Sequence, residues 1–349
     1  MDLNRENRRL PLWLLILLQL VLTGLVLCVF AVFHHVIPYA QRRNQPMPAP
    51  IATVAHAETE KAEEPAPLPE PTTEPEPTPE PEATPEPLPP TWAELFAEQL
   101  SDEAVWEENS YRSPTMAVTV TKYEYTEVCP DSVYFVADIY LTQIEQLRSV
   151  FPLAGTFALP TAVARDHDAV IAINSDVFVN QRSGFVVRDG ELYNQNPTTA
   201  DICVLYKDGR LCTYGPGEYA AEEIVAGEPW QIWHFGPALL NQDGSVKEQF
   251  NISSLLQAAH PRTAIGYYEP GHYCFVVVDG RQGSYSRGVT TQTLAAIMQD
   301  LGCAAAYNLD GGASSVMIFN GKLVNKPCGD RNLNDLIAIV EQTEEEAGE

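Results

Sequence analysis

Apolar residues occur in two patterns along this 349-residue chain, as one long run near the N-terminus and as many short runs after residue 90. The long run covers residues 12–33 and has no charged residue over its 22 positions, enough for a helix to cross a bilayer. Three arginines precede it and two follow it, a small excess that favours an N-terminus on the cytoplasmic side. The pattern predicts a cytoplasmic segment at 1–11 and a transmembrane signal-anchor helix at 12–33, with the rest of the chain extracytoplasmic.

A cleaved signal peptide is the alternative interpretation of this run. The sequence Val54–Glu58 has the small residues of a cleavage site. It lies about twenty residues beyond the apolar run, whereas such a site normally follows its apolar region closely. An uncleaved anchor is therefore favoured.

The short apolar runs after residue 90 are separated mainly by tight-turn signals. Pairs such as Asp189-Gly190 and Asn320-Gly321 stand between apolar flanks, which is typical of β-hairpins. One segment, Thr291–Leu301, has apolar residues at helical spacing and a preceding threonine that can cap a helix. We expect one α/β domain at 91–340, with a mixed sheet, hairpins and a few helices.

The segments on either side of this domain have the composition of solvated chain. Residues 58–90 hold twelve prolines, ten glutamates and no aromatic residue, so they cannot bury a core and they favour extended polyproline II. We expect 34–90 to be a disordered extracytoplasmic linker, a spacer between membrane and domain, and 341–349 to be an acidic tail.

The distribution of charge limits the partners of the domain. The chain carries −26 in total; segments 1–57, 58–90 and 341–349 carry +3, −9 and −5, which leaves −15 on residues 91–340. Such a surface argues against nucleic acid as a partner. No clustered His/Cys spacing indicates a zinc site, and the sequence requires no cofactor. A divalent cation among the acids is conceivable, although no loop has the spacing of a calcium site.

Three apolar runs end in the same way, with a carboxylate near small residues. The runs are 169–173, 273–278 and 303–307, and the carboxylates that follow them are Asp176, Asp279 and Asp310. Continuous apolar runs are typical of central strands that are covered on both faces. If the strands are neighbours in one sheet and run in the same direction, their acids meet at one edge, where ligand sites of α/β sheets lie. For any one acid, a turn without chemical function is the alternative.

Arginines near the second run indicate a site for an anion. A hairpin turn at Pro270-Gly271 would place Arg262 opposite Asp279, and Arg281 follows two residues later. An arginine held beside an aspartate is suited to bidentate binding of a phosphate or carboxylate. A structural cross-strand ion pair is the alternative.

Four segments together resemble the phosphodiester glycosidase family. They are AINSDVF, HPRTAIGYY, CFVVVDGRQ and GVTTQTLAAIMQDLGCAAAYNLDGGASSVM, and the resemblance covers roughly residues 162–340. Its most specific part is the order DGR, helix, NLDGG and two serines. The chain departs from the family pattern at Ser175 and Ala313, where glycine is common, and at Val177. The resemblance implies hydrolysis of a sugar-1-phosphodiester, with cleavage between the anomeric carbon and the phosphate oxygen.

The resemblance also implies roles for particular residues. Asp310 would be the principal catalytic carboxylate, with Asp176 and Asp279 as the second acid or its supports. Arg262 and Arg281 would hold the phosphate, whose charge grows as it leaves. The residues expected to bind sugar hydroxyls or to clear space for the sugar are Asn174, Asn308, Gly311, Gly312, Ser314 and Ser315.

The expected function is that of a membrane-anchored extracytoplasmic hydrolase that cleaves sugar-1-phosphodiester bonds in envelope or extracellular polysaccharide. Its partners would be a carbohydrate or sugar-phosphate polymer and the membrane. A catalytically inactive, polysaccharide-binding scaffold of the cell envelope is the main alternative. A serine hydrolase that uses Ser314 or Ser315 is disfavoured, because the sequence has no GxSxG nucleophile elbow.

Overall fold

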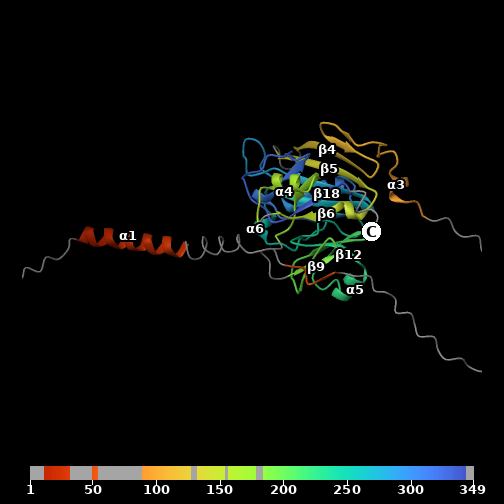
Figure 1. The fold of residues 1–349 in the computed structure, drawn as a ribbon. Coiled ribbons are helices and arrows are strands. Elements are labelled where there is room, and N and C mark those ends of the chain that lie inside the picture. The colour runs from red at the N-terminus through yellow and green to blue at the C-terminus, as the bar shows by residue number, and fades with distance from the viewer. Residues whose placement is uncertain are drawn as a thin grey trace, which may run out of the picture.

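The computed structural model describes residues 12–31, 49–53, 89–126, 132–153, 156–177 and 184–342. The predicted segment 1–11, most of the linker 34–90 and residues 343–349 of the tail lie outside the described residues. Helix α1 (Leu12–Ala31) is set apart from the domain in Figure 1. No helix among the described residues is both long enough and apolar enough to span a membrane. The transmembrane anchor at 12–33 is therefore not supported and stays a prediction.

The described part of the domain contains three β-sheets, and every strand pair in them is antiparallel. The seven-stranded sheet has the order β15 (Ala305–Asn308), β13 (Arg262–Glu269), β14 (His272–Val278), β5 (Ser132–Leu141), β4 (Met116–Tyr125), β3 (Ser110–Arg112) and β2 (Val105–Trp106). The six-stranded sheet has the order β1 (Ala52–Thr53), β9 (Glu191–Asn196), β8 (Gly184–Arg188), β12 (Pro229–His234), β10 (Ile202–Tyr206) and β11 (Leu211–Tyr214). The five-stranded sheet has the order β17 (Lys322–Leu323), β16 (Met317–Phe319), β7 (Ala169–Asn174), β18 (Leu336–Val340) and β6 (Leu147–Val150).

The helices of the described domain are few and short. They are α3 (Trp92–Leu95), α4 (Pro160–Asp166), α5 (Ala221–Ala226), α6 (Ser254–Gln257) and α7 (Thr291–Asp300), with 3₁₀ turns η2 (Ile144–Gln146) and η4 (Gly312–Ser314). The helix predicted at Thr291–Leu301 is confirmed as α7, and the Thr290 side chain accepts a hydrogen bond from the Thr293 N–H at its start. A sheet-rich domain with hairpins and few helices is likewise confirmed, although the sheets contain only antiparallel pairs among the described strands.

One apolar core joins the three sheets. It includes Phe275 from the seven-stranded sheet, Ile171 from the five-stranded sheet and Trp233 from the six-stranded sheet. Val276, the neighbour of Phe275 on β14, points to a second apolar cluster that α7 covers. The seven-stranded sheet is therefore covered on both faces, which explains its continuous apolar runs. In the view of Figure 1, the strands β6 and β18 of the five-stranded sheet lie between β4 and β5 on one side and β9 and β12 on the other.

Two of the three predicted strand ends lie at one edge. Strands β14 and β15 both pair with β13 in the antiparallel sense, so they run in the same direction and end at the same edge of the seven-stranded sheet. Strand β7 belongs to the five-stranded sheet, so the expectation that all three strands are neighbours in one sheet is wrong. The pattern could not distinguish the two cases because β7 is also buried on both faces, with Ile171 and Ala172 in different apolar clusters.

A short strand inside the predicted linker 34–90 extends the six-stranded sheet. Strand β1 pairs with β9, and the Ile51 N–H donates a hydrogen bond of 2.6 Å to the Leu192 carbonyl. The Thr53 hydroxyl donates to the Glu191 carboxylate at 2.7 Å. The chain contacts the domain again at Trp92, which packs against the main core. Residues on both sides of segment 54–88 are therefore attached to the same domain.

Candidate active site

A small pocket lies where β7 and β15 end. Three carboxylates, an arginine and small polar side chains line it, among them Asp176, Asp310, Asp335, Arg331, Asn174 and Ser314. Its free volume is about 10 Å³, which is room for about one water molecule. The polar side chains are therefore close to one another, and the pocket is nearly closed.

The Asn174 side chain joins the end of β7 to the seven-stranded sheet. Its amide nitrogen donates to the Asp310 carbonyl at 2.6 Å, and its amide oxygen accepts from the Thr263 hydroxyl at 2.7 Å. The Val316 N–H donates to the same oxygen at 3.2 Å. Asn174 thus fixes the position of Asp310 relative to β7 and leaves little of its own amide for a sugar.

Two of the carboxylates share one buried arginine. Arg188, the last residue of β8, donates to Asp176 at 2.5 Å, and its Nε lies 3.5 Å from Asp335. All three side chains are completely buried. The second oxygen of Asp176 accepts from the backbone N–H of His234 at 2.7 Å. Buried charges are tolerated when they are paired in this way, so Arg188 allows two acids to lie beneath the pocket.

The environment of Asp335 places its titration near neutral pH. Burial raises the pKa of Asp335 to about 7; the charge of Arg188 acts to lower this pKa and the charge of Asp176 acts to raise it. The Asn334 amide also donates to Asp335 at 2.8 Å. A carboxyl group with such a pKa can both hold and release a proton at neutral pH.

Asp310 is the pocket carboxylate with access to solvent. Its side chain is 15% exposed, and its Oδ2 lies 3.8 Å from Nη1 of Arg331, whose side chain is 42% exposed. The Gly311 N–H donates to Oδ1 at 2.9 Å. Burial raises the pKa of Asp310, while Ser314, Arg331 and the Gly311 N–H lower it and the charge of Asp176 raises it. A substrate that enters the pocket meets Asp310 and Arg331 first.

Asp279 lies outside this pocket. Its carboxylate accepts hydrogen bonds from the Asn325 amide at 2.8 Å, from the Lys326 N–H at 3.0 and 3.1 Å, and from the Tyr285 hydroxyl at 3.0 Å. Burial raises the pKa of Asp279, and these hydrogen bonds lower it. The geometry therefore gives Asp279 the position of an anchor for the turn at 325–326, and a catalytic role for it stays a prediction.

The hairpin register puts Arg262 in a different place from the one expected. Arg262 pairs with Val278 and not with Asp279, because Tyr268 is an extra residue that bulges out of the β13–β14 ladder. The buried Arg262 guanidinium donates to backbone carbonyls, which are those of Leu256 (2.6 Å), Ala258 (2.7 Å) and Val289 (3.2 Å). Burial lowers the pKa of Arg262 to about 10, and the nearby charge of Arg281 acts in the same direction. The expected Arg262–Asp279 pair is not formed.

Arg281 is exposed and lies beside the turn that follows Asp310. A Cβ atom at Gly312 would come within 3.0 Å of Nη1 of Arg281, and the φ angle of Gly312 is +69°. A Cβ atom at Gly311 would come within 2.8 Å of the Pro261 carbonyl oxygen. Both glycines are therefore required by close approach, and Gly312 lets the Arg281 guanidinium lie near the pocket.

The remaining predicted residues divide into one at the pocket and two that support the backbone. Ser314 lines the pocket beside Asp310. Asn308 is buried, and its amide donates to the carbonyls of Gly236 (2.8 Å) and Leu309 (3.0 Å). Ser315 is also buried, and its carbonyl accepts from the Asn325 amide at 3.0 Å. All three side chains are buried, so Ser314 contributes to the wall of the pocket while Asn308 and Ser315 shape the turn.

Comparison with known proteins identifies the segment that carries this pocket. Residues 167–340 match the family model described as phosphodiester glycosidase. This segment is a phosphodiester glycosidase domain. It runs from just before β7 to the end of β18 and contains Asn174, Asp176, Arg188, Asp310 and Asp335.

Two curated relatives align with this phosphodiester glycosidase domain. The SPbeta prophage-derived uncharacterized protein YomE of Bacillus subtilis (strain 168) is 30% identical over 170 residues, which are 47% of this chain and 26% of the relative. N-acetylglucosamine-1-phosphodiester alpha-N-acetylglucosaminidase of Mus musculus is 25% identical over 160 residues, which are 41% of this chain and 30% of the relative. The chain therefore spans less than a third of the length of either relative.

A solved structure shares the fold of the phosphodiester glycosidase domain. It is the catalytic domain of zebrafish N-acetylglucosamine-1-phosphodiester alpha-N-acetylglucosaminidase, auto-inhibited by its pro-peptide. The TM-score is 0.54 at 19% sequence identity, and the alignment covers 66% of this chain and 85% of that chain. At this identity the similarity establishes the fold alone.

Three residues of the site were not among those predicted, namely Asp335, Arg188 and Arg331. Asp335 stands before its strand, so a search for acids that follow apolar runs could not find it. Because β18 is antiparallel to β7, Leu336 pairs with Asn174, and the start of one strand lies beside the end of the other. An arginine at the end of a fully buried strand was the available signal for Arg188. The exposed Arg331 had no comparable signal.

Among the described residues, no group of three or more His, Cys, Asp or Glu side chains is placed to hold a metal ion. Asp176 and Asp335 are instead bridged by Arg188. The phosphodiester glycosidase domain thus presents one partly exposed carboxylate, two buried carboxylates and a cationic rim. This arrangement can position a polar substrate and move a proton.

Proposed function

We propose that this phosphodiester glycosidase domain hydrolyses the bond between the anomeric carbon of a sugar and an oxygen of a phosphodiester. Membership of a glycosidase-type hydrolase family implies a carbohydrate-type substrate. The observation that carries the proposal is the position of Asp310, partly exposed in the pocket and 3.8 Å from the cationic Arg331 at its rim. A carboxylate beside a cation is what an acetal carbon bound to a phosphate requires.

We assign Asp310 to the anomeric carbon, where its carboxylate either attacks directly or takes a proton from the attacking water. In both courses the bond between the anomeric carbon and the phosphate oxygen breaks, and the electron pair goes to that oxygen. Water supplies a hydroxyl group to the sugar, and its other proton goes to the carboxylate and then to solvent. The products are a free sugar and a phosphomonoester.

Arg331 and Arg281 are assigned to the phosphate. Arg331 lines the pocket beside Asp310, and Arg281 is exposed and lies next to Gly312 in the turn that follows Asp310. Negative charge grows on the phosphate as it leaves, so cations that are already in place lower the barrier. Arg262 is excluded from this assignment, because its guanidinium is used by three backbone carbonyls inside the protein.

Asp335 is assigned as a positioning residue for Asp176. With a pKa of about 7, it changes the charge of the buried group when it gains or loses a proton. The Arg188 bridge transmits this change to Asp176, whose charge in turn acts on Asp310. The ionisation of Asp310 is thereby coupled to a second, fully buried carboxyl group of the same pocket.

The deciding experiment compares the wild type with the Asp310→Asn variant. Both proteins are incubated with an N-acetylglucosamine-α-1-phosphodiester and, separately, with an alkyl α-glycoside. We expect the wild type to release free sugar from the phosphodiester only, and the variant to be slower by about 10²- to 10⁴-fold. Absence of sugar release from several sugar-1-phosphodiesters by the folded wild type would overturn the proposal.

One observation favours a second function, that of a polysaccharide-binding scaffold without turnover. Ser175, which lines the pocket, and Ala313 stand where the family commonly has glycine, a departure that favours binding without turnover. Binding without turnover would be equally strong in the wild type and in the Asp310→Asn variant. The enzyme and the scaffold therefore predict different results for the same pair of proteins.

The location of the protein is part of this proposal. We expect residues 91–340 to lie outside the cell membrane and to act on an envelope or extracellular polysaccharide, from the apolar run at 12–33 and the acidic, proline-rich segment that follows. Protease treatment of intact cells tests this location, because an extracytoplasmic domain is degraded while a cytoplasmic control protein survives. Survival of the domain would exclude it.

A further inference from the structure

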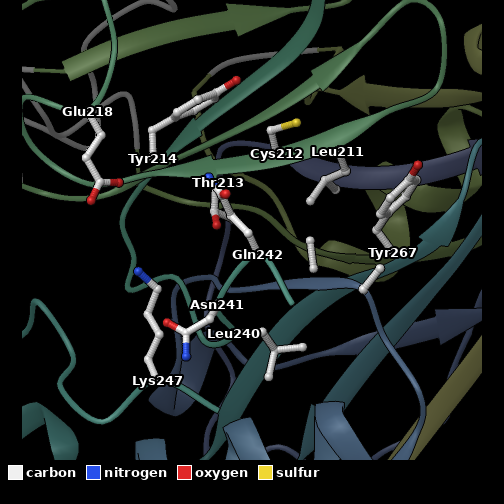
Figure 2. Close-up of a pocket in the computed structure, with 12 residues that line it drawn as sticks. Leu211, Cys212, Thr213, Tyr214, Glu218, Leu240, Asn241, Gln242, Lys247 and Tyr267 are labelled. Atoms are coloured by element: carbon white, nitrogen blue, oxygen red, sulfur yellow. The ribbon is translucent and has the colours of Figure 1, made fainter. Parts of the chain in front are cut away.

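A second cavity, of about 450 Å³, lies between strand β11 and the start of strand β15 (Figure 2). These are the edge strands of the six-stranded and the seven-stranded sheet, respectively. The cavity has the size of a small-molecule site and shares no lining residue with the pocket around Asp310. It is therefore a separate feature of the domain.

The cavity combines an apolar floor with a polar rim. Leu211, Leu240 and Ala305 form the floor, together with the ring of Tyr267. Thr213 and Tyr214 also line the cavity, as do four polar side chains that we call the rim, Glu218, Asn241, Gln242 and Lys247. In Figure 2, Glu218 and Lys247 lie on the same side of the cavity but come from opposite walls. A ligand must therefore offer both apolar faces and hydrogen-bonding groups.

Two of the rim side chains are fixed and two are available. The Gly215 N–H donates to the Glu218 carboxylate at 2.6 Å, and the Asn241 amide donates to the Ser245 hydroxyl at 2.9 Å. The side chains of Gln242 and Lys247 form no hydrogen bond or ion pair with other residues in the described part of the chain. Glu218 and Asn241 thus offer oriented acceptor oxygens to a ligand, and Gln242 and Lys247 offer N–H donors.

We propose that this cavity binds a sugar unit of a polysaccharide, with at most one phosphate attached. A sugar ring has C–H faces that pack on an aromatic ring and aliphatic floor, and hydroxyls that both donate and accept hydrogen bonds. Lys247 provides one cation for an adjoining phosphodiester. Glu218 disfavours a ligand with several clustered phosphates, such as a nucleoside triphosphate, because like charges repel at short distance.

The position of the cavity relates it to the candidate active site, and this step rests on the proposed function. The segment 305–310, which is β15 and the two residues after it, joins them, since Ala305 lines the cavity and Asp310 lines the pocket. Five residues of extended chain span roughly 17 Å, a distance that a few linked sugar units can cover. A polysaccharide of several units is therefore long enough to reach from the cavity to the pocket, and an oligomer can test whether one chain uses both sites.

The test uses the full chain with Asp310→Asn to prevent turnover, alone and combined with Gln242→Ala and Lys247→Ala. The probe is an oligomer of phosphodiester-linked N-acetylglucosamine, titrated by calorimetry. We expect the added substitutions to weaken binding by about tenfold, as loss of two ligand contacts does. In the active protein, the same two substitutions lower kcat/KM for the oligomer relative to the monomeric phosphodiester by about tenfold. Lys322→Ala, an exposed lysine on β17, serves as the control.

Equal affinity with and without the two substitutions would overturn this proposal, as would absence of oligomer binding or preferential binding of a nucleotide. The titration does not depend on catalysis. If the wild type cleaves no sugar-1-phosphodiester, the proposed function fails while the titration still decides what the cavity binds.

Discussion

Arg188 donates a hydrogen bond of 2.5 Å to Asp176, and both side chains are fully buried. The same guanidinium lies 3.5 Å from Asp335, so one cation serves two acids. With both acids ionised, the buried group would carry a net negative charge. The structure avoids this by raising the pKa of Asp335 to about 7 through burial. Below about pH 7 Asp335 is therefore mainly protonated, which lowers the net charge buried beside Arg188.

Replacement of Arg188 by methionine removes the cation and leaves two buried acids without their partner. We expect the free energy of unfolding to fall by about 3–5 kcal/mol, because breaking a buried ion pair leaves an uncompensated charge. Urea denaturation measures this change. Arg210→Met is the matched control, since Arg210 lies 2.6 Å from Asp208 but both side chains are about half exposed. The control should change stability by less than about 1 kcal/mol.

Comparable losses of unfolding free energy in the two arginine variants would show that the buried Arg188 bridge stabilises the fold no more than the exposed Arg210–Asp208 pair does. A loss confined to Arg188→Met, with far-ultraviolet circular dichroism unchanged at low denaturant, would confirm it.

The raised pKa of Asp335 predicts a pH dependence of stability. Between its ordinary pKa of 3.8 and the folded value of about 7, the folded state binds a proton that the unfolded state has released. The contribution of Asp335 to stability is therefore fully present at low pH and is lost as pH rises toward 7. Asp335→Asn should remove a slope of up to about 1.4 kcal/mol per pH unit in this window.

This difference is measured by urea denaturation of wild type and Asp335→Asn at several pH values from 4 to 8. Subtraction of the two curves removes the contributions of other carboxyl groups whose pKa is raised, such as Asp189 and Asp279. If unfolding free energy depends on pH in the same way in both proteins, the raised pKa of Asp335 is contradicted.

Asp279 and Asp310 should respond to the same substitution in opposite ways. Asp279→Asn weakens the hydrogen bonds from Asn325, Lys326 and Tyr285, and we expect a loss of about 1–3 kcal/mol in unfolding free energy. Asp310→Asn should leave stability within about 1 kcal/mol of wild type but abolish sugar release. Thermal unfolding and the phosphodiester assay on both variants check this. Loss of activity in a fully stable Asp279→Asn protein would restore a catalytic role to Asp279.

Arg331 should matter for the phosphate and for the protonation of Asp310. Removal of its charge in Arg331→Gln lowers kcat/KM for a sugar-1-phosphodiester by about 10- to 100-fold, as loss of a charge-assisted contact does. It also removes an interaction that lowers the pKa of Asp310. Because Asp310 acts in its ionised form, the acidic limb of the pH–rate profile should move to higher pH.

The profile is measured beside Arg112→Gln, an exposed arginine on β3 outside the pocket. The Arg112 variant should reproduce the wild-type curve. An unchanged acidic limb in Arg331→Gln would mean that Arg331 does not act on Asp310.

Local features of the fold were predictable from sequence, whereas the relation between sheets was not. The spacing of apolar residues and the Thr290 cap were sufficient for α7. The direction of β14 and β15 was also correct, because both strands pair with β13. The condition that β7 is a neighbour of β14 and β15 in one sheet is not met, and the sequence could not decide this because a strand buried on both faces has the same apolar pattern in any sheet. One bulged residue, Tyr268, was enough to move Arg262 away from Asp279.

In the candidate site, too, residues marked by a local pattern were predictable and residues brought in by pairing between distant segments were not. Asp176 and Asp310 follow apolar runs and line one pocket, as the pattern suggested. Asp279 follows such a run too, but its carboxylate is bound by the turn at 325–326, which no local pattern encodes. Asp335 and Arg188 reach the site only through antiparallel pairing between segments distant in sequence. Partners of this kind require the register of the sheets, and the sequence alone does not provide it.

Because β1 pairs with β9, the length of segment 54–88 does not determine how much chain separates α1 from the domain. Residues 51–53 are bound to the edge of the six-stranded sheet, and the chain is bound again at Trp92. Along the chain, residues 32–50 stand between α1 and the attached residues 51–53, and residues 54–88 stand between two points that contact the same domain. Insertion of residues into segment 54–88, or cleavage within it, would leave the length of chain between α1 and the domain unchanged while β1 stays paired. Three residues at a sheet edge, 51–53, therefore determine whether 19 or about 60 residues separate α1 from its first contact with the domain.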